Sequence, residues 1–90
     1  MTQLERSSIF EGESIALYIN GSGLSAKPDT SSLWQDFKII ATTITEGSNH
    51  RDFRIRMMLE PRRTGTIFIP SFNVGDVQSE LTILNVLPKN

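Results

Sequence analysis

The clearest strand signal in the chain lies at residues 50–59, whose sequence is HRDFRIRMML. The apolar side chains that share one face of this segment are Phe53, Ile55, Met57 and Leu59. Successive side chains of a strand point to opposite faces, so the pattern predicts a strand with one buried and one exposed face. Pro61 is expected to end it, because proline cannot donate to a central ladder.

Shorter apolar segments on both sides of this strand are separated by turn signals rich in Gly, Asn and Pro. Further strands are expected at residues 2–10, 14–20, 37–45, 66–69 and 78–87, with a bend at 70–76. In the 37–45 strand Phe37, Ile39 and Ala41 share one face and Ile40 and Ile44 the other, which predicts partial cover on both faces. The 78–87 strand has apolar residues of both parities, so the sequence leaves its facing open, and a β-bulge would reverse that facing midway.

One helical turn is expected near residues 31–36, because Ser32 and Gln35 have the spacing of a capping box. Leu33 or Trp34 is expected to pack against the core. Ile, Val and Thr total 21 residues and Ala only three, a composition that favours strands. The fold class predicted for residues 1–90 is therefore a single all-β sandwich of about seven antiparallel strands.

Charge and composition exclude several classes of function. Nine basic and ten acidic residues give a net charge of −1, which argues against a nucleic-acid partner. Because no apolar run approaches the roughly 20 residues of a transmembrane helix, we expect no membrane insertion by this segment. The absence of cysteine excludes disulfides, thiolate metal sites and a Cys nucleophile.

Catalytic chemistry finds little support in the sequence. His50 is the single histidine, and it lies in an expected turn without the G-x-S-x-G motif of a serine nucleophile. Glu11 and Glu13 are the closest pair of acids, and their position beside Gly12 favours a charged surface turn. We therefore predict no catalytic, cofactor-binding or metal-binding residues, and a protein that is not an enzyme.

A basic cluster gives the best candidate for a binding surface. Arg54 and Arg56 project from one face of the 50–59 strand, and Phe68 is expected to point outward from the next strand. In one interpretation these three residues form a partner-binding surface that attracts an acidic partner. In the other, the arginines are paired across strands with acids, and Phe68 lies under the loop at 70–76.

The order of motifs along the chain resembles a known family. Phe10-Glu11-Gly12-Glu13-Ser14 precedes an alternating strand, and Leu33-Trp34-Gln35-Asp36-Phe37 precedes another. The most specific segment is LEPRRTGTIFIP at residues 59–70. This order is similar to the BatD family of bacterial oxygen-tolerance, or aerotolerance-operon, proteins.

The resemblance implies an immunoglobulin-like domain excised from a longer, membrane-anchored protein on the periplasmic side of the bacterial inner membrane. It further implies protein–protein interaction in a stress-tolerance complex, with von Willebrand factor A-type Bat proteins as the expected partners. In the 59–70 segment, Leu59 and Ile67 are expected to face each other across a hairpin, and Gly65→Val is expected to cost stability if Gly65 has a positive φ. The alternative is a carbohydrate-binding or adhesion module that uses Trp34 and Tyr18, the only Trp and Tyr residues.

Overall fold

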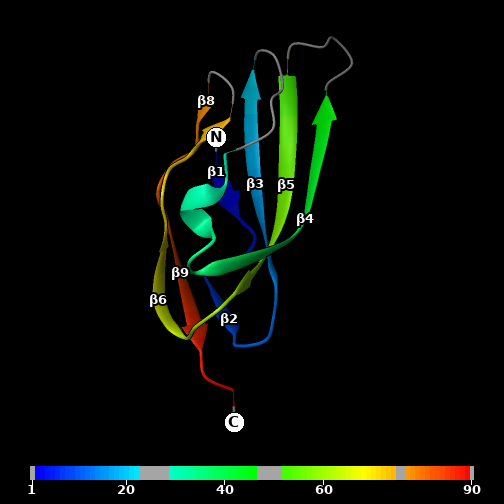
Figure 1. Ribbon diagram of the computed structural model, residues 1–90. Helices are drawn as coiled ribbons and strands as arrows, with labels where there is room; N and C mark the ends of the chain where they lie inside the picture. The colour runs from blue at the N-terminus through cyan, green and yellow to red at the C-terminus, as the bar shows by residue number, and fades with distance from the viewer. Residues whose placement is uncertain (1, 23–28, 47–51, 75–76, 90) are drawn as a thin grey trace.

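The computed structural model describes residues 2–22, 29–46, 52–74 and 77–89, which fold into a β-sandwich (Figure 1). The strands within these ranges are β1 (Thr2–Leu4), β2 (Ser8–Phe10), β3 (Ile15–Ser22), β4 (Phe37–Glu46), β5 (Asp52–Pro61), β6 (Gly65–Ile69), β7 (Asn73–Val74), β8 (Val77–Gln78) and β9 (Thr82–Leu87). One 3-10 helix, η1 (Ser31–Leu33), is the helical turn expected near residues 31–36. The predicted all-β class is confirmed.

Two sheets make up the sandwich. Sheet A has the strand order β1-β3-β5-β4, and sheet B has the order β2-β9-β6. β7 and β8 form a separate small hairpin. Five of the six strand pairings described are antiparallel, whereas β2 runs parallel to β9. The expectation of antiparallel strands throughout is thus wrong at one pairing.

That parallel pairing arises because the expected strand at 2–10 is divided between the two sheets. β1 pairs antiparallel with β3 in sheet A, and the chain then crosses to place β2 beside β9 in sheet B. Backbone hydrogen bonds hold both ends of the crossing: Glu5 N donates to Ala16 O at 2.9 Å, and Asn85 N donates to Ser7 O at 2.9 Å. One N-terminal segment therefore ties the two sheets together.

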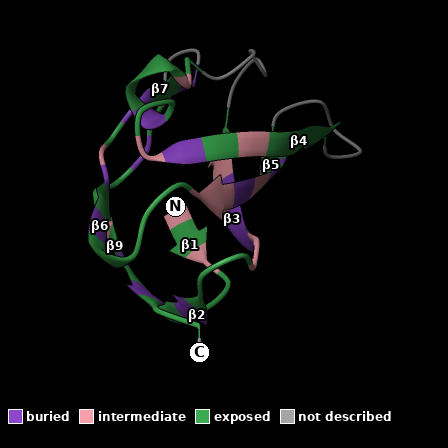
Figure 2. Cartoon of the chain, turned by 60° about the horizontal axis from the view of Figure 1, so that its bottom comes forward, coloured by how far each residue is buried: buried purple, intermediate pink, exposed green. Residues whose placement is uncertain are grey.

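The core lies between the sheets and follows the alternation of the strands (Figure 2). In β5 the residues Phe53, Ile55, Met57 and Leu59 are all buried, as the sequence pattern predicts. Sheet B contributes alternate residues of β6 and β9 to the same core. These buried residues of sheet B are Ile67, Ile69, Leu84 and Val86.

β4 departs from its predicted facing because a β-bulge lies between Ile39 and Ala41. The extra residue is Ile40, and beyond it Ala41 lies opposite Met58, on the outward side of sheet A. Residues 40–46 are all exposed, so the predicted partial cover on both faces is wrong for this part of the strand.

In β9 the two sets of alternating apolar residues point to opposite sides of sheet B. Leu84 and Val86 are buried, whereas Leu81 and Ile83 are exposed. The register of β9 with β6 is continuous from Ile69 to Gly65, so no bulge reverses the facing within this pairing. The segment predicted as one strand is interrupted: the short strand β8 ends at Gln78, and β9 begins at Thr82.

The 59–70 segment is a connection between sheets and not the predicted hairpin. β5 belongs to sheet A and β6 to sheet B, so Leu59 and Ile67 enter the core from opposite sheets. Gly65, at the start of β6, has φ of +103°, which meets the condition set for the Gly65→Val prediction. Glycine adopts this conformation without the steric penalty of a Cβ atom.

The order of sheet A matches the A-B-E-D sheet of immunoglobulin domains, and the β6–β9 pair matches their F and G strands. Among the described residues, the η1 segment and not a C strand lies between β3 and β4 in the chain, and it is held by hydrogen bonds from Arg62 N to Asp36 O at 2.8 Å and from Asp29 N to Asn73 O at 3.0 Å. Leu33 is buried, and Trp34 is exposed. The capping residue is Thr30, which makes no side-chain cap hydrogen bond, so the predicted capping box is not formed.

No helix within the described ranges is long and apolar enough to cross a membrane.

Candidate functional site

Arg54 and Arg56 lie on the outward side of sheet A, where both contact Tyr18 of β3. The Arg54 guanidinium carbon lies 4.6 Å from the centroid of the Tyr18 ring, a cation–π geometry. Arg56 Nε donates a hydrogen bond of 3.4 Å to the Tyr18 hydroxyl. The two arginines therefore share one aromatic partner, which holds their side chains against the sheet.

The cross-strand neighbours of these arginines carry no acid. Arg54 lies between Asn20 of β3 and Thr45 of β4, and Arg56 lies between Tyr18 and Thr43. The strand register therefore does not support the interpretation in which Asp or Glu residues pair with the arginines across the strands. We define this surface, made up of Tyr18, Asn20, Thr43, Thr45, Arg54 and Arg56, as the polar face.

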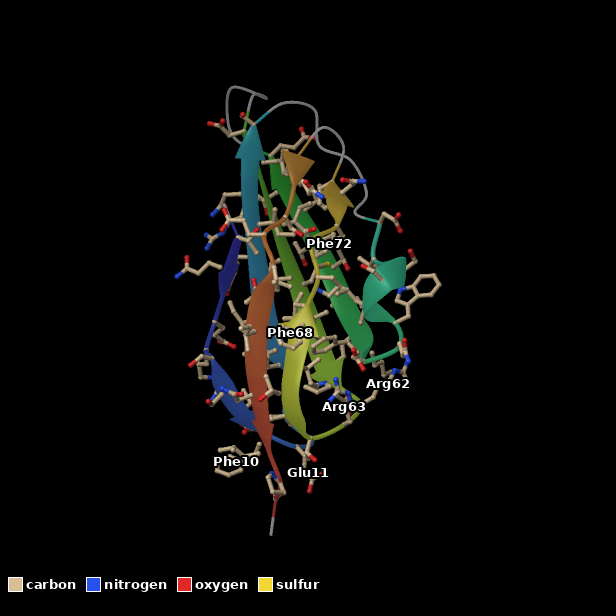
Figure 3. The ribbon with its side chains drawn as sticks, turned by 90° about the vertical axis from the view of Figure 1, so that its left-hand side faces the viewer. Phe10, Glu11, Arg62, Arg63, Phe68 and Phe72 are labelled. Atoms are coloured by element: carbon tan, nitrogen blue, oxygen red, sulfur yellow. The ribbon has the colours of Figure 1, made fainter. Side chains whose placement is uncertain are left out.

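Phe68 lies on the opposite side of the molecule, on the outward side of sheet B (Figure 3). Its side chain is 55% exposed. The described residues of the 70–76 loop therefore do not cover it, contrary to the alternative interpretation. Its neighbour across the strands is Ile83, which is 49% exposed. The structure thus does not bring Phe68 together with Arg54 and Arg56 into one surface.

The outward side of sheet B is uncharged along all three of its strands. Seven side chains point outward from these strands: Ser8, Phe10, Thr66, Phe68, Ile83, Asn85 and Leu87. Phe10 lies opposite Leu87, Phe68 lies opposite Ile83, and Thr66 Oγ1 donates to Asn85 Oδ1 at 3.0 Å between these apolar pairs. Leu81 continues the apolar row just before β9 and is also exposed.

We define the apolar face as Phe10, Phe68, Leu81, Ile83 and Leu87, which are five of the eight large exposed hydrophobic residues of the described chain. Sequence reasoning identified Phe68 alone. The signal for the others was present in β9, where both parities are apolar: one parity fills the core and the other forms this face.

A third surface lies at the end of the sandwich where β5 turns toward β6 (Figure 3). An open hollow of about 450 Å³ is lined by Glu11, Gly12, Pro61, Arg62, Arg63 and Lys89. Its two arginines are engaged elsewhere: Arg63 Nε lies 3.1 Å from Asp36 Oδ1, and Arg62 Nε donates to Trp34 O at 3.1 Å. These arginines hold the η1 segment in place, which gives them a structural role.

The two acids considered for catalysis are engaged with the backbone. Glu13 Oε1 accepts a hydrogen bond from Phe10 N at 2.8 Å, and Glu11 Oε1 accepts one from Lys89 N at 3.0 Å. Over residues 2–22, 29–46, 52–74 and 77–89, no group of three or more His, Cys, Asp or Glu side chains is placed to hold a metal ion. His50, the other candidate, lies outside the described residues.

These features define a class of protein: an immunoglobulin-like β-sandwich domain with one polar and one apolar outer face. The chain belongs to the BatD family, since residues 2–86 match the family described as BatD DUF11 like domain. That description names no catalytic activity. Comparison with curated proteins and with solved structures gave no match.

Proposed function

We propose that this domain is a non-catalytic protein–protein interaction module of a larger, membrane-anchored BatD protein. In this proposal it works on the periplasmic side of the bacterial inner membrane, within an aerotolerance or stress-tolerance complex. The proposed partner is a von Willebrand factor A-type Bat protein. Family membership supports the setting, and the apolar face supports the mode of action.

The observation that carries the proposal is the apolar face itself. Several exposed apolar side chains on one side of a sheet are typical of contact sites, whereas single exposed ones are ordinary. Phe68 and Ile83 lie opposite each other near its middle, and an interface that covers them removes apolar area from water. Burial of the exposed part of each side chain contributes about 1 kcal/mol to binding.

The polar face is a weaker candidate for the same role. Arg54 and Arg56 are held against Tyr18, and an interface over them must desolvate two cations whose strand neighbours are neutral. Because the two faces point in opposite directions, one small partner surface does not cover both. Phe68 is therefore the proposed anchor, and Arg54 and Arg56 are a separate hypothesis that the same experiment tests.

The experiment is a capture assay from solubilised bacterial membranes with three versions of the purified chain. These are the wild type, a Phe68→Thr/Ile83→Thr variant and an Arg54→Glu/Arg56→Glu variant, each checked for folding by circular dichroism. We expect the wild type and the arginine variant to capture a von Willebrand factor A-type protein, and the Phe68/Ile83 variant to lose it. Mass spectrometry identifies what is captured.

Each other result has a definite meaning. Loss with the arginine variant alone assigns the interface to the polar face. Capture by all three versions contradicts both faces, and capture of no von Willebrand factor A-type protein by any version contradicts the proposed partner.

A carbohydrate-binding or adhesion module is the second candidate, and one observation favours it. Trp34 is 61% exposed, and its indole Nε1 donates to Thr30 Oγ1 at 3.1 Å, which fixes the ring at the surface. Tyr18, by contrast, is covered by Arg54. Binding on a glycan array that is lost in Trp34→Ala is the result this candidate requires, and an array without binding contradicts it.

A further inference from the structure

β4 is an open edge of sheet A. Among the strands that the structure describes, β4 pairs with β5 and with no strand on its other side. Residues 40–46 are exposed whichever way their side chains point (Figure 2). Thr42 and Ile44 point toward sheet B, as Met57 and Ile55 opposite them do, yet the three strands of sheet B leave them uncovered. Residues 41–45 therefore present exposed side chains and backbone groups that no second described strand pairs.

The chemistry of this edge favours pairing with another strand. Natural sheets protect their edges with lysine, proline, bulges or very short strands. Residues 39–45, with the sequence IIATTIT, contain no charge, no proline and no glycine, and six of the seven are β-branched. Uncharged β-branched segments of this length are those that pair readily with other strands. The bulge at Ile40 precedes residues 41–45 and leaves them regular.

We propose that β4 joins two copies of this chain, which pair antiparallel through residues 41–45 around a two-fold axis at Thr43. The product is one continuous sheet of eight strands, four from each copy. This proposal is independent of the proposed function, because it concerns a different surface from the apolar face.

A second copy fits because the edge is complementary to itself. An axis at Thr43 places Thr43 opposite Thr43, Thr42 opposite Ile44 and Ala41 opposite Thr45, and every pair shares a side of the sheet. No like charges meet, and threonine and aliphatic pairs across strands are favourable. The same surface thus serves both copies, as an isologous two-fold interface requires.

The dimer is expected to be weak. Two short strands bury less surface than the roughly 1,600 Å² of a standard interface. Association should therefore depend on protein concentration, and in a membrane-anchored parent protein it is favoured by the high local concentration of the copies.

The absence of cysteine from the chain makes disulfide trapping a direct test. In the proposed pairing the two Thr43 Cα atoms are about 4.5–5.5 Å apart, which is within the range of a disulfide. The two Thr45 Cα atoms lie about 13 Å apart, since each is opposite Ala41 of the other copy. Mild oxidation should give covalent dimers with Thr43→Cys and not with Thr45→Cys. Thr64→Cys, in the exposed connection before β6, is the matched control.

Sedimentation of the unmodified chain gives the second readout. We expect reversible dimers in the wild type and an increase of about tenfold or more in the dimer dissociation constant for Thr42→Lys, since a lysine on an edge opposes strand pairing. Thr64→Lys, which adds the same charge elsewhere, should dimerise as the wild type does, and so should Phe68→Thr/Ile83→Thr.

Three results overturn the proposal. One is a chain that stays monomeric at every concentration and is not trapped by Thr43→Cys beyond the level of Thr64→Cys. The second is a maximum of trapping at another position, which contradicts the axis at Thr43. The third is association that the Phe68/Ile83 variant abolishes and Thr42→Lys does not, which assigns it to the apolar face.

Discussion

The outward sides of the two sheets are built by the same alternation and yet carry different chemistry. On sheet A, Arg54 and Arg56 share the ring and hydroxyl of Tyr18, and threonines of β4 lie beside them. On sheet B, all seven outward positions of the strands are uncharged, and Phe68 and Ile83 lie exposed opposite each other.

This difference distinguishes the apolar side chains that folding requires from those that it does not require. Both inward sides are apolar because they form one shared core, which any sandwich requires. The outward sides are under no such constraint, so an outward side without charge is not explained by folding. An uncharged outward side is typical of contact sites, which is why we base the proposed function on the apolar face.

The largest expected effect tests this distinction directly, because the same substitution is made in the core and on the apolar face. Ile55→Ala removes a fully buried side chain of β5 and should lower the free energy of unfolding by about 2–5 kcal/mol. Ile83→Ala, on the apolar face, should lower it by about 1 kcal/mol or less. Urea denaturation measures both. Equal losses would mean that the apolar face is part of the folding core, and the comparison would fail.

A smaller effect is expected at the connection that carries the chain from sheet A to sheet B. Gly65→Val should lower the free energy of unfolding by about 1–2 kcal/mol, because valine resists a φ of +103°. The cause is the backbone alone, since a Cβ atom at this position meets nothing within 4 Å. Gly65→Asn is the matched variant and should lose less, since asparagine tolerates positive φ. A valine variant as stable as the wild type would contradict this geometry.

Much of the fold was predictable where one face of a strand is apolar and the other polar. β5 satisfies this condition over its whole length, and its buried residues were predicted correctly. The division of residues 2–10 between two sheets was not predictable, because the crossing at residues 5–7 depends on partners distant in the sequence, Ala16 and Asn85. Residues 2–10 contain no Gly, Pro, Asn or Asp that would signal the change, and the serines at the crossing are weaker turn signals.

The candidate surfaces were harder to predict, because alternation does not show which side of a strand is buried when the residues on both sides are apolar. In β9 the second parity is the apolar face, and in β4 Ile40 and Ile44 lie on an open edge. The sequence alone offers two explanations for such a strand, burial on both sides or exposure of apolar side chains. Choosing between them requires knowing how many strands the opposite sheet has.

The smallest expected effect concerns the polar face, and it sharpens the comparison by asking whether its arginines are engaged. A double-mutant cycle of Tyr18→Leu and Arg54→Gln should give a coupling free energy of about 0.5–1 kcal/mol, the value of an exposed cation–π contact. Tyr18→Phe keeps the ring under Arg54 and loses only the hydrogen bond from Arg56, so its cycle with Arg54→Gln should show little coupling. Urea denaturation of the single and double variants supplies the free energies.

A coupling near zero between Tyr18→Leu and Arg54→Gln would mean that Arg54 is not held by the ring, and its guanidinium would then be available to an acidic partner. That result would weaken the preference for the apolar face, because the preference depends on the arginines being already satisfied within their own sheet.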